Sequence, residues 1–364
     1  MKTVIDQPVN KLPVLTYRWL KLNQYNLQEP IAVPLKSYTK PFVNLEAAGK
    51  HVEITAAPPA VRELGLDAGV SSQLTQLSQT TANTGIQIMV PMNQAVETPV
   101  EIAYHLDHEN SSVIESNQIT AEENSQITLV FDYTSEPGAA VFHNGFTHIT
   151  AKSGSVVNIV KIQRMEDQAL HFDAVTADID PHAQVNLIQA ELGSQLAVTN
   201  YAANLQEGAD VNIKSLYFGD QERVIDVSFQ MNHIGRRSTS RLTARGVLKD
   251  CARKAFKGTL DFKKGASRAE GSEDEYVLLL DPTVKSDSVP LLLCGEEDVK
   301  GEHAASCGKF DPDQLFYLMS RGFDKTEASR LIVEAVFNPV IDEIPIQTLK
   351  AAVSEVIQRR LAGD

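Results

Sequence analysis

From about residue 85 onward, apolar and polar side chains alternate in short runs that resemble one another. A period of two is that of a β-strand with one buried face. Alignment of Ile127, Val157, Val185 and Val211 gives steps of 30, 28 and 26 residues between consecutive runs. The chain therefore contains a repeated strand unit whose length drifts. Each of the four aligned runs begins with a small residue: SQITLVFDY (125–133), SVVNIVKIQR (155–164), AQVNLIQAEL (183–192) and ADVNIKSLYF (209–218).

Strands and turns repeated at a near-constant step are typical of a solenoid or of a sandwich. A sandwich usually closes its hairpins through Asn-Gly or Asp-Gly turns. The chain has one Asn-Gly pair, at 144–145, and no Asp-Gly pair. We therefore predict a mainly β protein whose core, residues 85–310, is an irregular parallel β-helix.

The first sixty residues show neither the apolar period of a strand nor that of a helix, and prolines recur at 30, 34 and 41. Prolines at this density interrupt helices and central strands alike. We predict that residues 1–84 form an N-terminal arm with lead-in strands. We expect the arm to pack Tyr17, Trp19 and Leu20 on the body of the protein.

After Phe310 the apolar period changes to that of a helix, which predicts a helical domain over 311–364. Asp311 is a suitable N-cap, Pro312 suits the first helical position, and Gln314 stands where a capping box needs it. Gly322 is expected to end this helix. Its apolar face consists of Leu315, Phe316, Leu318 and Met319.

Two more helices are predicted behind the first. Asp324 and Glu327 form a second capping box, and the pair Asn338-Pro339 is expected to stop that helix. The third helix follows Pro345. We expect the three helices to cover the open end of the coil and to leave apolar surface for a partner. The apolar positions are Leu331, Ile332, Ala335 and Val336 in the second helix, and Leu349, Val353, Val356, Ile357 and Leu361 in the third.

Two segments carry concentrated charge. The basic stretch RRSTSRLTAR (236–245) is predicted to be a strand whose arginines point outward and pair with nearby acids. The acidic stretch EGSEDE, of which GSEDE is 271–275, is predicted to be a charged surface loop or tight turn. Cation binding by its carboxylates is the alternative, but acidic surface loops are far more common, so these acids are not counted as site residues.

The formal charge of −14 disfavours nucleic acid as a ligand, because an acidic field repels phosphate backbones. No apolar run is long enough to span a membrane, and the N-terminal segment lacks the apolar region of a signal peptide. Three cysteines, Cys251, Cys294 and Cys307, cannot form a disulfide framework. We therefore expect free thiols and a cytoplasmic location.

The run GEHAASCGKF places Glu302, His303 and Cys307 close together, as a metal site does. Alone it is a weak signal, because a structural site normally has four ligands. His303 and Cys307 share a face whether the segment is a helix or a strand. The alternative is structural: a partly buried histidine and a free cysteine near a helix cap.

Four stretches, in this order, resemble the core of the SufB/SufD family, scaffold subunits of the SUF machinery that assembles iron–sulfur clusters. The resemblance covers about residues 85–345, and the third stretch is its most specific part. It implies an irregular right-handed β-helix with a C-terminal helical domain. The stretches are RSTSRLTARGVL, KAFKGTLDF, GEHAASCGKFDPDQLFYLMSRGF and ASRLIVEAVFNPVI.

Within the family the chain is similar to SufD-type proteins. SufB-type chains have a cysteine six residues before the proline that here is Pro290, and this chain has Val284 there. They also have an acid directly after the histidine, where this chain has Ala304. His303 matches the histidine that SufD-type chains offer at the SufB–SufD interface. From the resemblance, we expect the N-terminal helical region of many relatives to be absent from this sequence.

The resemblance implies a scaffold without catalysis that pairs with a SufB-like subunit through its last strands. A SufC-like ATPase is expected on the C-terminal helices, and a homodimer is a further expectation. No cofactor is expected in the isolated chain, whereas iron or a nascent cluster is expected at the SufB–SufD interface, with His303 as a ligand and Glu302 and Cys307 as weaker candidates. Whether the assembled complex also binds a reduced flavin stays open. The expected partner-binding residues are Asp311, Leu315, Phe316, Leu318, Arg321, Leu331 and Phe337.

Two other functions compete with this hypothesis. A β-helix enzyme acting on carbohydrate needs clustered carboxylates and aromatic platforms on an outer face. The repeats instead show Asn, Ile and Lys, and aromatic residues make up 6% of the chain. A stand-alone metal carrier would be expected to have CxxC or HxH spacing, which the chain does not contain.

Overall fold

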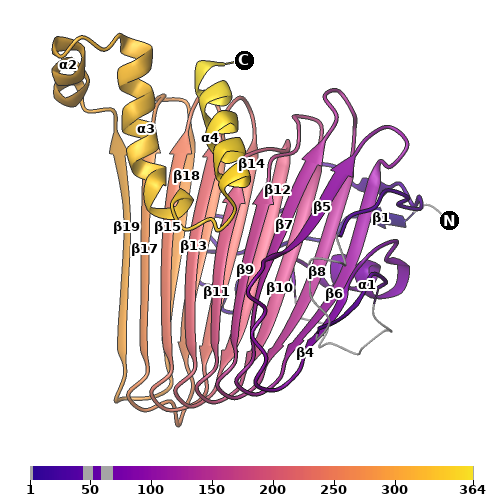
Figure 1. Cartoon of the computed structure of the whole chain (residues 1–364). Coiled ribbons are helices and arrows are strands. Elements are labelled where there is room, and N and C mark those ends of the chain that lie inside the picture. The colour runs from indigo at the N-terminus through magenta and orange to yellow at the C-terminus, as the bar shows by residue number, and fades with distance from the viewer. Residues whose placement is uncertain (1–2, 44–51, 59–68, 364) are drawn as a thin grey trace.

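The computed structural model describes residues 3–43, 52–58 and 69–363, and Figure 1 shows their arrangement. The predicted arm and lead-in segment lies partly outside these residues. The core is a coil of two facing sheets, with one strand of each sheet in every turn. From β4 to β19 all pairing within the two sheets is parallel, so the predicted parallel β-helix is confirmed.

One sheet has nine strands and the other eight. The nine-stranded sheet contains β3 (Glu53–Thr55), β4 (Gln87–Val90), β6 (Ser112–Ala121), β8 (Phe142–Ala151), β10 (Leu170–Ile179), β12 (Leu196–Leu205), β14 (Val224–His233), β16 (Arg253–Phe262) and β18 (Lys285–Cys294). The eight-stranded sheet contains β5 (Val100–Leu106), β7 (Gln126–Ser135), β9 (Val156–Gln163), β11 (Gln184–Glu191), β13 (Asp210–Gly219), β15 (Thr239–Leu248), β17 (Glu270–Leu279) and β19 (Lys300–Lys309).

The register of the coil is the one that the repeats predict. Ile127 pairs with Val157, Val157 with Val185, and Val185 with Val211. All four side chains are buried in the interior of the coil. Each fully buried aliphatic side chain contributes about 1.5–3 kcal/mol. The varying step is absorbed between the strands, so that the ladders stay aligned.

The two charged segments behave differently. Most of the basic stretch lies in β15, where two arginines point outward and pair with acids as predicted: Arg241 with Asp210 at 3.2 Å and Arg245 with Asp274 at 2.6 Å. The first two arginines, Arg236 and Arg237, lie in the turn before the strand. The acidic stretch is not a loop, because it lies in β17 with its strand alternation intact. The prediction of a surface loop is therefore wrong. The segment is a strand, and alternate acids of this strand face the interior of the coil.

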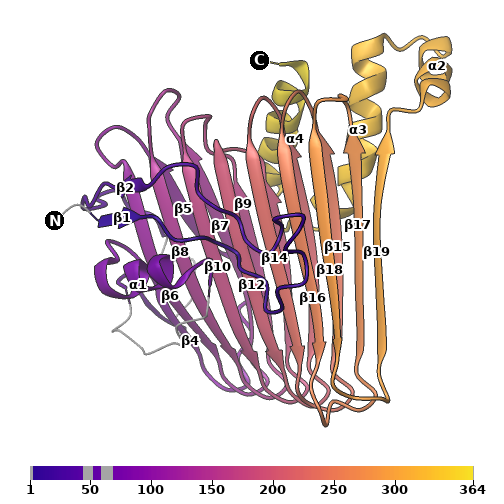
Figure 2. The same cartoon turned by 180° about the vertical axis from the view of Figure 1, so that it is seen from behind.

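The N-terminal arm runs across the outer face of the nine-stranded sheet (Figure 2). It begins with an antiparallel pair, β1 (Thr3–Ile5) and β2 (Ile31–Val33). Tyr17 packs with Leu12 on the outer face of β18, as expected. Trp19 and Leu20 do not pack, since they are 95% and 65% exposed. They lie in the turn of residues 18–21.

A helix that the sequence reading did not predict, α1 (Ser72–Thr81), packs on β6 and β8. Ser71 is its N-cap, and its side chain accepts a hydrogen bond from the backbone N–H of Leu74. Leu74 and Leu77 are buried against the same outer face that the arm crosses. Two apolar positions in a polar segment are a weak sequence signal for a helix. Packing of these two side chains on the sheet stabilises the helix.

The C-terminal helices are α2 (Pro312–Ser320), α3 (Lys325–Ile341) and α4 (Gln347–Ala362). Asp311 caps α2, but its side chain accepts a hydrogen bond from the backbone N–H of Asp313 and not from that of Gln314. The capping box of α3 is present. This helix continues through Pro339, so the predicted stop is wrong. Beyond the proline, Val340 and Ile341 are buried, and that packing favours one further helical turn.

The helices do not cover the open end of the coil, which corrects a second expectation. α3 and α4 lie on the outer face of the eight-stranded sheet (Figure 1), over an apolar strip that includes Ile162, Leu216 and Phe218. Val333 and Phe337 of α3 pack on this strip. The outward positions of these strands are therefore apolar because helices bury them. No described helix is long and apolar enough to span a membrane.

Candidate functional site

The open end of the coil is formed by the last strand of each sheet. β18 and β19 each pair with a neighbour on one side only within the described structure, and they form the far edge in Figure 1. Most of β19 is exposed. An edge strand has unpaired N–H and C=O groups that can pair with another chain. This end therefore has the features of a protein interface.

His303 and Cys307 face the same side of β19. They are in register with Glu273 and Val277 of β17, whose side chains are buried inside the coil. Paired positions in a parallel ladder share a face. Both side chains therefore point into the open end of the coil, where they are exposed.

Glu302 does not join them. Its carboxylate faces outward and lies 3.4 Å from the ammonium group of Lys300, with both side chains 65% exposed. His303 and Cys307 are four residues apart, roughly 13 Å along a strand. This distance is too long for two side chains perpendicular to the sheet to bind one ion. The three candidates therefore do not form a metal site within the chain.

A buried ion pair lies just below the open end. Glu275 accepts hydrogen bonds from the ammonium group of Lys254 at 2.6 Å and from the hydroxyl of Tyr217 at 2.6 Å. The hydroxyl of Ser288 donates to its other oxygen at 2.5 Å. Burial lowers the pKa of Lys254, and the charge of Glu275 opposes this. Because its lone pairs are engaged by three donors, Glu275 is a structural counter-ion.

Glu273 has the opposite character. It is 4% exposed, and neither carboxyl oxygen has a hydrogen-bond partner among the described residues. Burial, and secondly the charge of Glu275, raises the pKa of Glu273 to about 8. Sequence reasoning set Glu273 and Glu275 aside as acids of a surface loop, and it missed Lys254. Their signal was present in the strand alternation of residues 270–279, which the dense charge obscured.

A second group of buried ionisable residues lies farther inside the coil. Candidate ligand atoms of Glu115, His143 and Asp173 lie within 4.8 Å of one another. The ammonium group of Lys161 is 2.7 Å from Asp173, and the hydroxyl of Tyr133 donates to Glu115 at 2.5 Å. The protein's own cation and donors thus satisfy the carboxylates. This group is a neutralised core network and not a vacant metal site.

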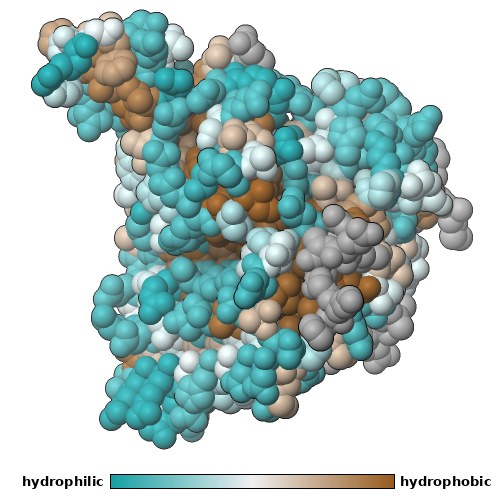
Figure 3. Space-filling view, viewed as in Figure 1, coloured by the Kyte–Doolittle hydropathy of each residue, from teal (hydrophilic) through white to brown (hydrophobic). Residues whose placement is uncertain are grey.

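The groove between α2 and α3 forms an apolar cavity of about 530 Å³. No residue of α2 is buried, and Phe316 and Tyr317 are 74% and 56% exposed. Figure 3 shows hydrophobic surface over α2. The cavity is lined by Arg245, Tyr276, Gln314, Tyr317, Leu318, Leu331, Ile332, Ala335, Val336 and Pro339.

Two of the seven partner-binding residues expected from the sequence line this groove. Leu318 and Leu331 line it and are half-buried. Asp311, Phe316 and Arg321 are exposed, and Leu315 is half-buried. Phe337 is different, because it is fully buried beside Phe218, with ring centroids 6.4 Å apart. Its side chain is therefore not available to a partner.

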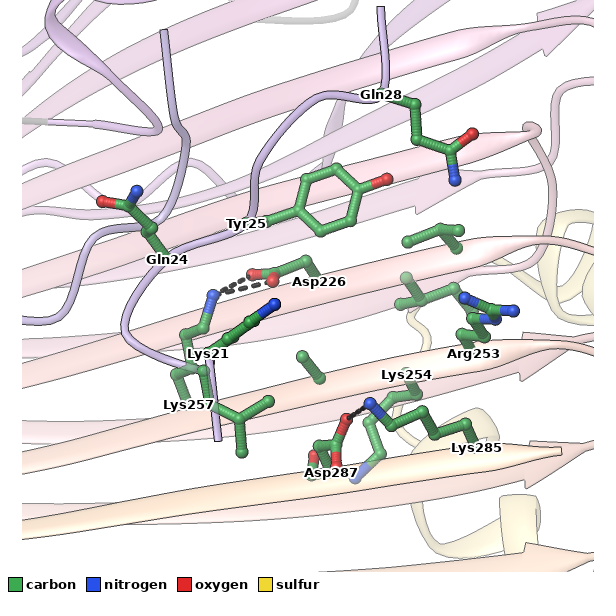
Figure 4. Close-up of a pocket in the computed structure, with 14 residues that line it drawn as sticks. Lys21, Gln24, Tyr25, Gln28, Asp226, Arg253, Lys254, Lys257, Lys285 and Asp287 are labelled. Carbon is green, nitrogen blue, oxygen red and sulfur yellow. Dashed lines mark hydrogen bonds and ion pairs between the residues drawn. The ribbon is translucent and has the colours of Figure 1, made fainter. Parts of the chain in front are cut away.

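A smaller cavity of about 170 Å³ lies between the arm and the nine-stranded sheet (Figure 4). Its two carboxylates are each paired with a lysine: Asp226 with Lys257 at 2.7 Å and Asp287 with Lys285 at 3.0 Å. Lys257 also donates to the backbone carbonyl of Asn10 in the arm. This last hydrogen bond anchors the arm on the sheet.

All three cysteines are free and exposed, as expected. Cys294 and Cys307 lie on β18 and β19, whereas Cys251 lies in the turn before β16. Two of the three thiols therefore belong to the strands that form the open end.

Comparison with known proteins identifies the same core. Residues 104–336, more than half of the chain, match the family model described as "SUF system FeS cluster assembly, SufBD core domain". The chain is 31% identical over 292 residues to the iron-sulfur cluster assembly protein SufD of Bacillus subtilis, a match that covers 79% of this chain and 67% of that protein. It is 25% identical over 265 residues to an iron-sulfur cluster assembly SufBD family protein of Staphylococcus saprophyticus, covering 72% of this chain and 57% of that protein.

Proposed function

Because this chain belongs to the SufB/SufD family of the SUF system for iron–sulfur cluster assembly, we propose that it is a SufD-like scaffold subunit without catalysis of its own. The observation that carries the proposal is the open end of the coil, where a strand paired on one side only presents His303 and Cys307. The two side chains are too far apart to hold one ion together. A scaffold whose site is completed by a partner accounts for both features.

The first proposed partner is a SufB-like subunit that binds the edges of β18 and β19. Both edges have unpaired backbone groups, and a coil of the same fold has matching edges to offer. Ala304 stands where SufB-type chains have an acid, and Val284 where they have a cysteine, so the missing groups would come from the partner. The same edges allow a homodimer when the partner is absent.

The second proposed partner is a SufC-like ATPase that binds the groove between α2 and α3. α2 has three exposed aromatic or sulfur-containing side chains, namely Phe316, Tyr317 and Met319. Exposed apolar surface of this kind, beside a preformed cavity, is typical of a docking site. Because α2 follows β19 directly in the chain, motion of the ATPase would be transmitted to β19 through α2.

Iron or a nascent cluster is the proposed cargo at the shared edge. Imidazole is a ligand of borderline softness and a thiolate a soft one, and both bind iron. An orphaned buried carboxyl group beneath His303 also fits a cation at this position. Glu302 contributes nothing, because its carboxylate faces the outer surface.

The alternative of a carbohydrate-active enzyme finds no support in the described residues. The carboxylate groups around Glu115 and Glu273 are inside the coil, where a polysaccharide has no access. An enzyme of that class needs its acid and its nucleophile or base on an open surface.

Co-expression with a SufB-like and a SufC-like subunit, followed by size-exclusion chromatography, tests the proposal. We expect a three-component complex for the wild type. Leu318→Asp should release the ATPase and keep the SufB-like subunit, since the new charge is confined to the groove. Retention of all three subunits by this variant would contradict the groove assignment, and a chain that binds neither subunit would contradict the whole proposal. Deletion of 312–364 is a poor test, because α3 and α4 cover apolar core residues of the coil.

A further inference from the structure

One ladder inside the coil changes character in its last two positions. In the eight-stranded sheet, Ile159, Leu187, Ile213 and Leu242 lie in register and are all buried in the interior. The next position of the same ladder is Glu273, and the last is His303. An apolar column that ends in an acid and a histidine is not explained by core packing.

The acid costs stability where it stands. A buried polar group without a hydrogen-bond partner costs about 1–3 kcal/mol. Both oxygens of Glu273 lack a hydrogen-bond partner in the described part of the chain, although Glu275 two residues later is satisfied by three donors. Leucine, as at Leu242, would fill the position at no such cost. A group kept at a cost to folding is a candidate for function.

The neighbours of Glu273 come from its own ladder and from the opposite sheet. Its carboxyl group reaches across the coil to the backbone of Gly258, where an added Cβ would lie 2.4 Å from one oxygen. Leu242 lies on its inner side in the ladder, and His303 lies on its outer side. Neighbouring positions of a ladder are about 4.8 Å apart, a separation that side chains can close to share one ion. Beyond His303 the coil is open.

We propose that the carboxylate of Glu273 and the imidazole of His303 are this chain's half of a metal site for a borderline divalent cation such as Fe²⁺. The inference rests on the proposed function, because a protein partner at the open end must supply the remaining ligands. An oxygen and an imidazole nitrogen form a mixed donor set that suits Fe²⁺ and its analogue Co²⁺. Glu275 is excluded by its three donors, and Glu302 by its outward direction.

Co²⁺ binding by the purified complex with the SufB-like subunit tests the inference, followed anaerobically through the visible absorption of the bound ion. Loss of a partner that only orients a ligand costs about 10–100-fold in metal affinity, so loss of a ligand should cost at least about tenfold. We expect such a loss, and a changed spectrum, for Glu273→Gln and for Glu273→Leu. Glu302→Gln is the matched control and should bind Co²⁺ as the wild type does.

The outcomes separate the two proposals. If the wild-type chain forms no complex with the SufB-like subunit, the proposed function fails and the shared site with it. If the complex forms and both Glu273 variants bind Co²⁺ with wild-type affinity and spectrum, only the metal-site inference is overturned. Glu273→Leu guards against misfolding of the other variant, because it extends the apolar column and should melt at or above the wild-type temperature.

Discussion

At the scale of single residues, position in a ladder decides what each side chain can do. Glu273 and Glu275 are two residues apart on one strand and share the interior, yet one lacks partners and the other has three. Lys254 and Ser288, from two strands of the opposite sheet, account for part of this difference. The environment of an acid in this coil is therefore set across the sheets.

His303→Ala should impair cluster maturation more than folding. The ring is exposed, and substitutions at exposed sites change the free energy of unfolding by about 0.5 kcal/mol or less. We expect wild-type melting and complex formation, with reduced activity of an iron–sulfur reporter enzyme in cells. Cys307→Ser should have a smaller effect. Normal maturation with His303→Ala, or failure of the variant to fold, would show that the histidine is structural.

Glu191 should make the protein less stable as the pH rises. Burial raises its pKa to about 8, from an ordinary value of 4.5. Below the pKa of the unfolded state, Glu191 is protonated in both states, and its contribution to the free energy of unfolding is fully present. That contribution is lost as the pH rises through the pKa of the folded state. A full proton corresponds to about 1.4 kcal/mol per pH unit.

Urea denaturation between about pH 5 and pH 8 measures this effect, because the window lies between the two pKa values. The free energy of unfolding of the wild type should fall relative to that of Glu191→Gln, in which nothing titrates at this position. The difference cancels other groups, such as the buried His233, whose pKa burial lowers to about 4. Parallel pH curves would show that Glu191 is ionised throughout.

At the scale of elements, the C-terminal helices divide into a packed pair and a projecting one. α3 and α4 bury Val333, Phe337 and Val353 on the eight-stranded sheet. None of the nine residues of α2 is buried. Its exposed apolar side chains stabilise nothing in this chain, which is why we assign them to a partner.

Phe337→Ala should strongly destabilise the protein, since truncation of a buried phenylalanine costs about 3–5 kcal/mol. Phe337 is fully buried against the sheet. Phe316→Ala is the matched comparison, because Phe316 is 74% exposed and should change stability by about 0.5 kcal/mol or less. Thermal melting of the two variants distinguishes the roles. Similar losses in both would mean that α2 packs on the body in solution.

At the scale of the whole molecule, the coil is closed along its sides and open at one end. The arm covers the outer face of one sheet, and α3 and α4 cover that of the other. Strand edges are usually protected in proteins that act alone. The unprotected end is consistent with a chain that works in an assembly.

Ala305→Lys should block assembly at this end without unfolding the chain. Ala305 is exposed and lies in register with Glu275, so its side chain faces the open interior. A lysine there places a charge in the proposed interface, yet costs the isolated chain about 0.5 kcal/mol or less. Chromatography with the SufB-like subunit should show loss of the complex. Ala304→Lys, on the outer side of the same strand, should keep it, and an equal loss there would move the interface to the outer face.

The sequence alone determined the elements that depend on local pattern. The alternation and the steps between Ile127, Val157, Val185 and Val211 predicted the strands and their register, because a ladder stacks like on like. Helix ends were read from Asp311, Asp324 and Gly322, whose capping acts within one turn. The side shared by His303 and Cys307 followed from even spacing.

Only the tertiary structure decided which side chains are buried and which are exposed. Acids at 273 and 275 are buried because the opposite sheet supplies Lys254 and the backbone of Gly258 leaves room. The apolar face of α3 lines an open groove, whereas Phe337, expected at a partner, is core. Burial depends on contacts between residues far apart in the sequence, whereas periodicity records only neighbours along the chain. The orphaned carboxyl group beneath His303 could be recognised only once those contacts were known.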